Sequence, residues 1–199
     1  LKLKSPEDEK RLAEFKDRLD AAEALLPAAL ARVGYTDPAT IMRLIDPVIV
    51  RPLSAEWKAA KTDIAADMAK SKKAGDKPYK QAQGRFVAHL ELLKHYRVLD
   101  AACGSGNFLY LALLALKELE HRVNLDAEVL GFQRAFPAIG PEAVHGIEIN
   151  PYAAELARVS VWIGEIQWMR RNGFTVPGNP ILKPLENIER RGAVLNDDG

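Results

Sequence analysis

Two acidic residues and two glycines have the types and spacing of a binding site for a small polar ligand. Asp100 is followed by a turn that contains Gly104 and Gly106, and Glu148 lies 48 positions after Asp100. A carboxylate at Asp100 can accept hydrogen bonds from a ligand ammonium, directly or through water. One at Glu148 can accept both hydroxyls of a ribose. Glycines in the turn permit positive φ and remove the Cβ atoms that would strike a ligand.

The flanking residues predict the elements that must bring these positions together. Residues 96–101 are predicted as a strand, and residues 107–123 as a helix that is apolar nearly all round and therefore buried. Residues 144–149 are predicted as a second strand, which carries Glu148 at its end. Ligands bind at the carboxyl ends of parallel strands, so both acids are expected at one crevice. The helix N-terminus at Asn107 would add backbone N–H groups there.

The two acids lie farther apart than a dinucleotide-binding fold expects, and the turn lacks one of the glycines of that fold. A dinucleotide fold places its acid about 20 residues after the glycines and has a third glycine three positions after the second. In this chain Leu109 occupies that third position. Residues 124–141 are predicted as an insert with a short helix, which would account for the greater distance. A nicotinamide-dependent dehydrogenase is therefore an alternative and not the main interpretation.

The second half of the chain continues with a helix and a third strand. Pro151 suits a first helical position, and the predicted helix over residues 151–172 ends at Gly173. Its inner stripe is predicted to consist of Leu156, Val159, Ile163 and Ile166. Residues 174–185 are predicted as a loop rich in proline and glycine, and residues 187–195 are predicted to hold a third strand.

The residues before the first strand are predicted to be helical throughout. An apolar stripe with alternating spacings of three and four marks a first helix, which Pro27 bends or ends. The stripe consists of Leu12, Phe15, Leu19, Ala22 and Leu26. Thr36 or Asp37 is then expected to act as an N-cap. The short helix that follows, over residues 40–46, is expected to end at Pro47.

Two longer helices complete the first half of the chain. One is predicted over residues 54–70 and the other over residues 81–94, with a polar breaker segment at residues 71–78 between them. The first of these helices is expected to carry three large side chains on one side. They are Trp57, Ile64 and Met68.

Composition fits a soluble globular protein. The chain has 199 residues, of which 48% are hydrophobic and 28% charged, which is enough for a sizeable core. The expected fold is a partial Rossmann-like sheet at residues 95–199, preceded by a helical N-terminal region at residues 1–94. No apolar run reaches the roughly 18 residues that span a bilayer, and the N-terminus lacks a secretory apolar core, so no membrane partner is expected.

Charge and cysteine content restrict the remaining classes of site. The single cysteine, Cys103, excludes an internal disulfide, which makes the reducing cytoplasm the expected compartment. The four histidines lie far apart and there is no cysteine pair, so no metal site is expected. A complete nucleic-acid enzyme more often shows a basic stripe, whereas this chain has a net charge of only +1. Any nucleic-acid surface is therefore expected to be local or to lie outside this chain. The cluster of Lys72, Lys73, Lys77 and Lys80 is interpreted as a solvated loop.

Several reactive or aromatic residues are best interpreted as packing residues. Cys103 has no histidine partner in the sequence and is predicted to be a small packing residue. His95 and His145 are interpreted as ordinary helix and strand-edge residues. The three tryptophans are predicted to lie in the core or at a subunit contact. They are Trp57, Trp162 and Trp168.

Two segments resemble known motifs of the amino-directed DNA methyltransferases. Residues 100–108, Asp-Ala-Ala-Cys-Gly-Ser-Gly-Asn-Phe, resemble the first motif of that family, with Ala101 in place of its usual proline. Residues 145–153, His-Gly-Ile-Glu-Ile-Asn-Pro-Tyr-Ala, look like the second motif. The first motif is the most specific part of the resemblance, which covers about residues 34–195.

Other segments are similar to particular groups within that family. Residues 34–38, followed by Ile41 and Met42, look like the N-terminal motif that closes over the methionine end of the cofactor. Its position ahead of the first motif is typical of the adenine-modifying group. Residues 41–57 and 153–168 are similar to large enzymes that fuse nuclease, methyltransferase and target-recognition regions.

The resemblance implies S-adenosylmethionine as the cofactor and implies which residues contact it. Asp100, Gly104, Gly106 and Glu148 would hold it, with Thr36 near its methionine carboxylate. Asn107 and Phe108 would line the pocket. The cofactor-binding residues expected on this basis are Tyr35, Thr36, Asp100, Ala102, Gly104, Gly106, Asn107, Phe108, Glu148 and Ile149. No residue of this chain is expected to be catalytic.

The chain departs from the family at two later motifs. A third motif near residues 188–195 usually supplies an acid to the cofactor adenine, but Gly192 and Ala193 stand where Asp-Ala is expected. Asn187 or Ile188 would then pack against the purine. The catalytic motif, Asn or Asp followed by Pro-Pro and Tyr or Phe, is absent. Asn150-Pro151-Tyr152 starts a predicted helix, and residues 179–180 are not followed by a second proline.

These observations predict the cofactor-binding part of a cytoplasmic DNA adenine-N6 methyltransferase from a restriction–modification or phage-defence system. The complete enzyme would flip an adenine out of double-stranded DNA, held mostly by regions outside this chain. The 199 residues alone are expected to show no methyl transfer. The alternative is a non-catalytic module that binds S-adenosylmethionine or acts as a scaffold.

Overall fold

The structure is a computed structural model that describes residues 37–174 and 185–193. The predicted helix over residues 12–26, its end at Pro27 and the loop residues 175–184 lie outside the described residues. Within the described ranges no helix is both long and apolar enough to cross a membrane.

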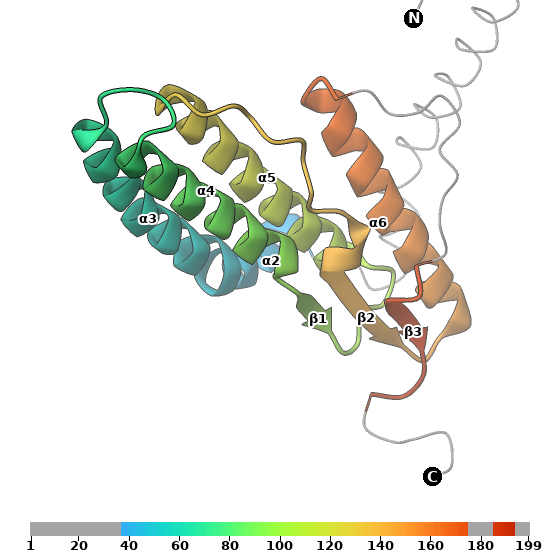
Figure 1. The fold of residues 1–199 in the computed structure, drawn as a ribbon. Helices are drawn as coiled ribbons and strands as arrows, with labels where there is room; N and C mark the ends of the chain where they lie inside the picture. Colours follow the sequence, from blue (N-terminus) through green and yellow to red (C-terminus); the bar gives the residue numbers. More distant parts are fainter. Residues whose placement is uncertain (1–36, 175–184, 194–199) are drawn as a thin grey trace, which may run out of the picture. The chain divides into compact units, whose positions relative to one another are not determined.

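A layer of helices precedes the sheet (Figure 1). Helix α2 (Pro38–Ile45) is followed directly by the π-helical segment η1 (Asp46–Val50) and by α3 (Arg51–Lys70). Helix α4 (Lys77–His95) then runs back along α3. The predicted cap is confirmed, because the Asp37 carboxylate accepts a hydrogen bond from the Thr40 N–H at 3.0 Å.

The prediction that Pro47 ends its helix is wrong. The chain remains helical through Pro47, which occupies the first turn of the π-helical segment. The Arg51 N–H donates to the Asp46 carbonyl, five residues back, and this wider turn accommodates a residue that has no N–H. The helices predicted around residues 40–46 and 54–70 are therefore joined.

Asp76 explains why α4 begins four residues earlier than predicted. Its carboxylate accepts hydrogen bonds from the Tyr79 N–H at 2.9 Å and from the Lys72 N–H at 2.8 Å. The hydroxyl of Ser71 donates to the same carboxylate. These donors, the Tyr79 N–H first, lower the pKa of Asp76. The polar segment thus ends in a capped helix start, with Pro78 in the first turn.

The sheet has three parallel strands in the order β1-β2-β3. These are β1 (Val98–Asp100), β2 (Val144–Glu148) and β3 (Ile188–Arg190), and all three strands were predicted from the sequence. Helix α5 (Asn107–Val129) and the short 3-10 segment η2 (Pro141–Ala143) connect β1 to β2, and α6 (Pro151–Arg171) follows β2. The order β1-α5-β2-α6-β3 confirms the predicted Rossmann-like α/β arrangement.

Both crossover helices pack on one face of the sheet. Val98, Val144 and Ile188 point to that face and are buried. On the opposite face Leu99 is 61% exposed. A hollow of about 320 Å³ lies there, lined in part by Leu99, His145 and Ile147. Parallel sheets are normally covered on both faces, so this face is the incomplete side of the described fold.

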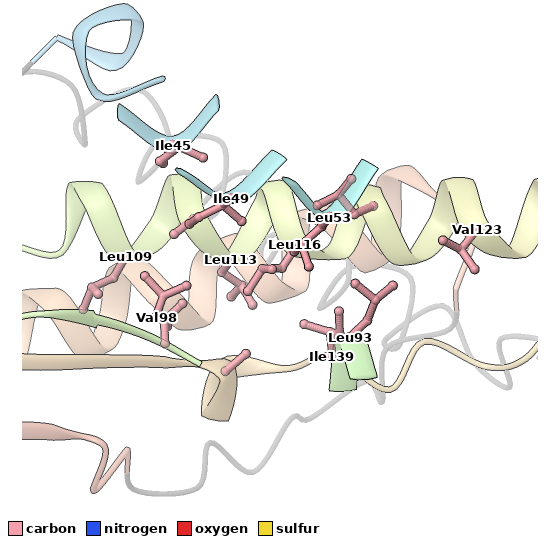
Figure 2. Packing of buried hydrophobic residues seen from close by; sticks show 14 of the residues in the cluster. Ile45, Ile49, Leu53, Leu93, Val98, Leu109, Leu113, Leu116, Val123 and Ile139 are labelled. Atoms are coloured by element: carbon pink, nitrogen blue, oxygen red, sulfur yellow. The ribbon is translucent and has the colours of Figure 1, made fainter. Parts of the chain in front are cut away.

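Helix α5 lies at the centre of the core. Leu113 and Leu116 are fully buried and belong to one cluster with α2, α3 and the strands (Figure 2). Trp57 and Trp168 are each 5% exposed, as expected of core residues. The cluster contains residues from both sides of position 94, and the domain boundary placed there stays a prediction.

Helix α5 is longer than predicted. It continues to Val129, so residues 124–129 belong to this helix and not to the insert predicted over residues 124–141. Asn124 does not break the helix, because its amide group donates to the Glu120 carbonyl and accepts from the Ala135 N–H at 2.8 Å. Asp126 accepts hydrogen bonds from Trp57 Nε1 and Lys61 Nζ. Packing against α3 therefore extends the helix beyond its apolar stretch.

The predicted inner stripe of α6 is wrong, since two of its four residues are exposed and the other two, Ile163 and Ile166, are only half-buried. Leu156 and Val159 are 41% and 50% exposed, whereas the buried side consists mainly of small residues. The buried residues are Ala153, Ala154, Ala157, Ser160, Val161, Gly164, Trp168 and Met169. A Cβ on Gly164 would lie 2.8 Å from Tyr110 Cδ2, so α6 approaches α5 too closely for large side chains. The predicted end at Gly173 is confirmed by its φ of +77°.

A buried ion pair joins α5, α6 and the segment before η2. The Lys117 side chain is fully buried and its Nζ lies 2.9 Å from Glu165 Oε2. The same Nζ donates to the Ile139 carbonyl at 2.8 Å and lies 4.6 Å from the centre of the Trp168 ring. Glu120 accepts hydrogen bonds from the N–H groups of Ala138 and Ile139. This lysine was not singled out in the sequence, because Glu118 and Glu120 follow it and such a run of charges is typical of an exposed helix face.

Candidate functional site

The candidate site lies at the carboxyl ends of β1 and β2. Asp100 ends β1 and pairs in register with Gly146, so Glu148 at the end of β2 extends two residues farther. The turn over residues 101–106 folds back over this edge, since the Cys103 N–H donates to the Ile147 carbonyl at 3.0 Å. The structure therefore brings Asp100, the glycine turn and Glu148 together, as the sequence predicts.

Glu148 joins the two segments directly. Its Oε2 accepts a hydrogen bond from the Gly104 N–H at 2.9 Å, and its Oε1 accepts one from the Asn150 N–H at 2.7 Å. The residue is only partly buried. Each carboxylate oxygen can accept two hydrogen bonds, so each keeps one acceptor position for a ligand. Backbone donors therefore fix the orientation of this carboxylate and leave it able to bind hydroxyl groups.

The surroundings of the two glycines in the turn differ. Gly104 has a φ of +53°, and a Cβ added there would have no atom within 4 Å. Gly106 has a φ of +85°, and its added Cβ would lie 2.8 Å from Ala157 Cα. Only Gly104 therefore borders open space in which a ligand could approach the backbone. The missing Cβ of Gly106 makes room for α6, and the predicted contact of Gly106 with a cofactor stays a prediction.

The other predicted site residues lie around the same turn. Asp100 Oδ1 accepts a hydrogen bond from the Ala102 N–H at 3.1 Å, which holds the start of the turn. Gly106 is the N-cap of α5, so the first N–H groups of α5 begin at this edge. Asn107 is half-buried, and Phe108 packs partly against the core. Ile149 is 73% exposed next to Glu148.

Two of the predicted cofactor-binding residues cannot be placed on this site. Tyr35 and Thr36 lie outside the described residues. The described part of that segment begins with Asp37, whose side chain caps α2. The predicted role of the N-terminal motif therefore stays a prediction.

Cys103 lies beneath the turn and is a packing residue. It is 6% exposed. Burial, with smaller effects from the charges of Asp100 and Glu148, raises the pKa of its thiol to about 11. The thiol is therefore protonated near neutral pH and is a poor nucleophile. This agrees with the prediction from sequence that Cys103 has no catalytic role.

The expectation that Asn187 or Ile188 packs against a purine at this edge is wrong. Ile188 is fully buried under α6. The Asn187 amide donates to the carbonyls of Pro141 and Val144, at the opposite end of β2. It is Arg190, at the carboxyl end of β3, that pairs in register with Glu148.

Gly146 and Ala157 contribute to this edge but were not singled out in the sequence. Gly146 is buried in β2 beneath the turn, and Ala157 is the residue of α6 that Gly106 contacts. A glycine inside a predicted strand, two positions before a terminal acid, is the signal that could have identified Gly146, because such a glycine often marks a close approach.

Comparisons with known proteins agree with this arrangement. Residues 72–186, more than half of the chain, match the family model described as the DNA-methyltransferase domain of MmeI. DNA methyltransferase A of Bacillus subtilis is 28% identical over 134 residues, which are 67% of this chain and 13% of that protein. A putative type II restriction enzyme and methyltransferase of Methanocaldococcus jannaschii is 32% identical over 81 residues, 40% of this chain and 7% of that protein.

A solved structure has the same fold. The type IIL restriction–modification enzyme MmeI in complex with DNA matches 74% of this chain with a TM-score of 0.54 and 23% sequence identity. The match covers 18% of the MmeI chain, so the present chain spans only a small part of its relatives. Since the matched family model covers more than half of its residues, the chain belongs to the family of MmeI-type DNA-methyltransferase domains.

Proposed function

We propose that the edge formed by Asp100, Gly104 and Glu148 binds S-adenosylmethionine for the methylation of adenine in DNA. The observation that supports this most directly is the hydrogen bond between the Gly104 N–H and Glu148 Oε2, which joins the two motif segments at one place. The residues fit the cofactor. Glu148 keeps acceptor positions for the ribose hydroxyls, and the space next to Gly104 is open.

The charges at this edge also suit this cofactor. Asp100 and Glu148 are the acids at the ends of β1 and β2, and an acidic edge favours a ligand with an ammonium and a sulfonium group. Bound S-adenosylmethionine supplies an electrophilic methyl group. The chain's own residues bind and orient the cofactor: Asp100 is assigned to its ammonium and Glu148 to its ribose, with the exposed Ile149 beside the purine.

Replacing Glu148 with alanine tests the proposal. We expect the dissociation constant of S-adenosylhomocysteine to rise by about 5- to 150-fold, which corresponds to about 1–3 kcal/mol, because the ligand hydroxyls lose a charged acceptor. Isothermal titration calorimetry on the full chain measures it, with NAD as the comparison ligand. Glu189→Ala on β3 is the matched control, since Glu189 is exposed and is not expected to contact the cofactor. Binding of NAD but not of S-adenosylhomocysteine would contradict the assignment.

The names of the relatives support DNA as the substrate and further domains in the same polypeptide. The MmeI structure is titled as a complex with DNA, and the Methanocaldococcus relative is named as both a restriction enzyme and a methyltransferase. We assign double-stranded DNA as the substrate, held mainly by regions other than these 199 residues. Nuclease and target-recognition regions in the same polypeptide are part of this assignment.

The catalytic step is assigned to a segment other than the described site. The 199-residue sequence contains no Pro-Pro pair, which the catalytic motif of amino-directed enzymes requires. We therefore expect no transfer of labelled methyl groups from S-adenosylmethionine to DNA by these 199 residues alone, even where S-adenosylhomocysteine binds. Measured turnover would overturn this expectation. The alternative is a non-catalytic module that binds the cofactor. It predicts that a longer polypeptide that still lacks the motif also transfers no methyl groups.

A further inference from the structure

Three consecutive residues of β2 hold the glycine turn in place. Gly146 lies directly against the Cys103 side chain, the Ile147 carbonyl accepts from the Cys103 N–H, and the Glu148 carboxylate accepts from the Gly104 N–H. The last two contacts are hydrogen bonds of 3.0 and 2.9 Å. The contact between Gly146 and Cys103 is a packing contact, and it leaves no room for a side chain at position 146.

The space at Gly146 is fully used. A Cβ added there would lie 2.7 Å from Cys103 Sγ and 2.8 Å from Leu109 Cδ1. Both distances are shorter than carbon or sulfur atoms tolerate, so something must shift. The end of the Leu109 side chain can rotate away. Rotation of the Cys103 sulfur does not free this residue, because its Cβ would still lie 3.2 Å from the added Cβ and its backbone N–H is bonded to β2.

The geometry assigns Gly146 as a positioning residue. It sets the distance between the glycine turn and β2, and hence the distance between Gly104 and the Glu148 carboxylate. This inference rests on the proposed cofactor site. A side chain at position 146 would lift Cys103 and Gly104 toward the space that the ligand needs. It would also lengthen the hydrogen bond that orients Glu148. Gly146 thus acts on ligand binding without contacting the ligand.

The test compares Gly146→Ala, Cys103→Ala and the double variant in the full chain. S-adenosylhomocysteine binding is measured by calorimetry well below the unfolding temperature, and far-UV circular dichroism verifies the fold. We expect Gly146→Ala to raise the dissociation constant at least tenfold. Cys103→Ala removes the sulfur atom from the crowded contact, so the double variant should return to within about threefold of Cys103→Ala alone.

Gly84→Ala is the matched control for the change from glycine to alanine. A Cβ at Gly84, on α4, has no atom within 4 Å, so this variant should bind as the wild type does. A folded Gly146→Ala with unchanged affinity would overturn the inference. If Gly146→Ala does not fold, the double variant decides: rescue of folding and binding supports the inference, and absence of rescue contradicts it. Absence of binding by the wild type would instead contradict the proposed function.

Discussion

Replacing Gly106 with alanine is expected to lower the free energy of unfolding by about 2–5 kcal/mol. About 1–2 kcal/mol comes from placing an L-residue in the left-handed region, and about 1–3 kcal/mol comes from overpacking against α6. The φ of Gly106 is +85°, and the added Cβ would lie 2.8 Å from Ala157 Cα. Because the obstacle is backbone, no change of rotamer relieves it, and α5 and α6 must separate.

Gly104→Ala is the matched comparison for this prediction. Its φ is +53° but the added Cβ meets no atom within 4 Å, so we expect a loss of only about 1–2 kcal/mol, from backbone strain alone. Gly104→Ala should weaken S-adenosylhomocysteine binding by more free energy than it takes from the stability of the fold, because the Cβ would enter the space next to the ligand. Urea unfolding followed by circular dichroism measures both stabilities. Equal losses for the two variants would show that α6 does not constrain position 106.

Replacing Lys117 with alanine is expected to lower the free energy of unfolding by about 3–5 kcal/mol, because the largely buried Glu165 carboxylate loses its partner. Lys117 Nζ also contacts the Ile139 carbonyl and the face of the Trp168 ring, so the substitution leaves a cavity between α5 and α6. Urea unfolding at pH 7 measures the loss. A loss below 1 kcal/mol would mean that water or a rearranged side chain replaces the ammonium group.

The cost of Lys117→Ala should depend on pH with a definite sign. Burial raises the pKa of Glu165 and of Glu120 above their ordinary value of 4.5, against the opposing charge of Lys117. Without Lys117 these folded-state pKa values rise further, because the positive charge that lowers them is lost while the negative charge of Glu142 remains nearby. Stability that depends on a raised carboxyl pKa is present below the unfolded value and lost as pH rises through the folded value. The cost should therefore be smaller at pH 4.5 than at pH 8.

A double-mutant cycle separates the ion pair from the packing. Lys117→Met keeps most of the volume, and Glu165→Gln removes the charge that Lys117 neutralises. We expect each single variant to be less stable than the double variant, because either one leaves an unpaired buried charge. Additive losses would instead show that the two charges do not interact.

The local elements of the fold could be predicted from the sequence because their signals are local. The cap at Asp37 depends on residues within a few positions of it, and so does the end of α6 at Gly173. The three strands were identified by short apolar runs next to turn residues. Asp100, the glycine turn and Glu148 were correctly expected at one edge, because parallel strands place their carboxyl ends together.

Contacts between distant residues explain the wrong predictions. Pro47 was expected to stop a helix, but packing of α2, η1 and α3 against α5 favours a continuous helical path with a wider turn. The stripe of large residues at Leu156 and Val159 has helical spacing, yet it is exposed. In both cases the local signal was present, and the packing of another helix decided the outcome.

The sequence by itself determined which residues form the turn, the two acids and the strands that carry them, since those depend on residue type and spacing over short distances. Only the tertiary structure decided what each glycine is for. Gly104 borders open space, Gly106 makes room for Ala157 and Gly146 for Cys103. The sequence shows only that each of these residues is glycine. The reason that a side chain is excluded depends on which atom of a distant segment lies where the Cβ would be.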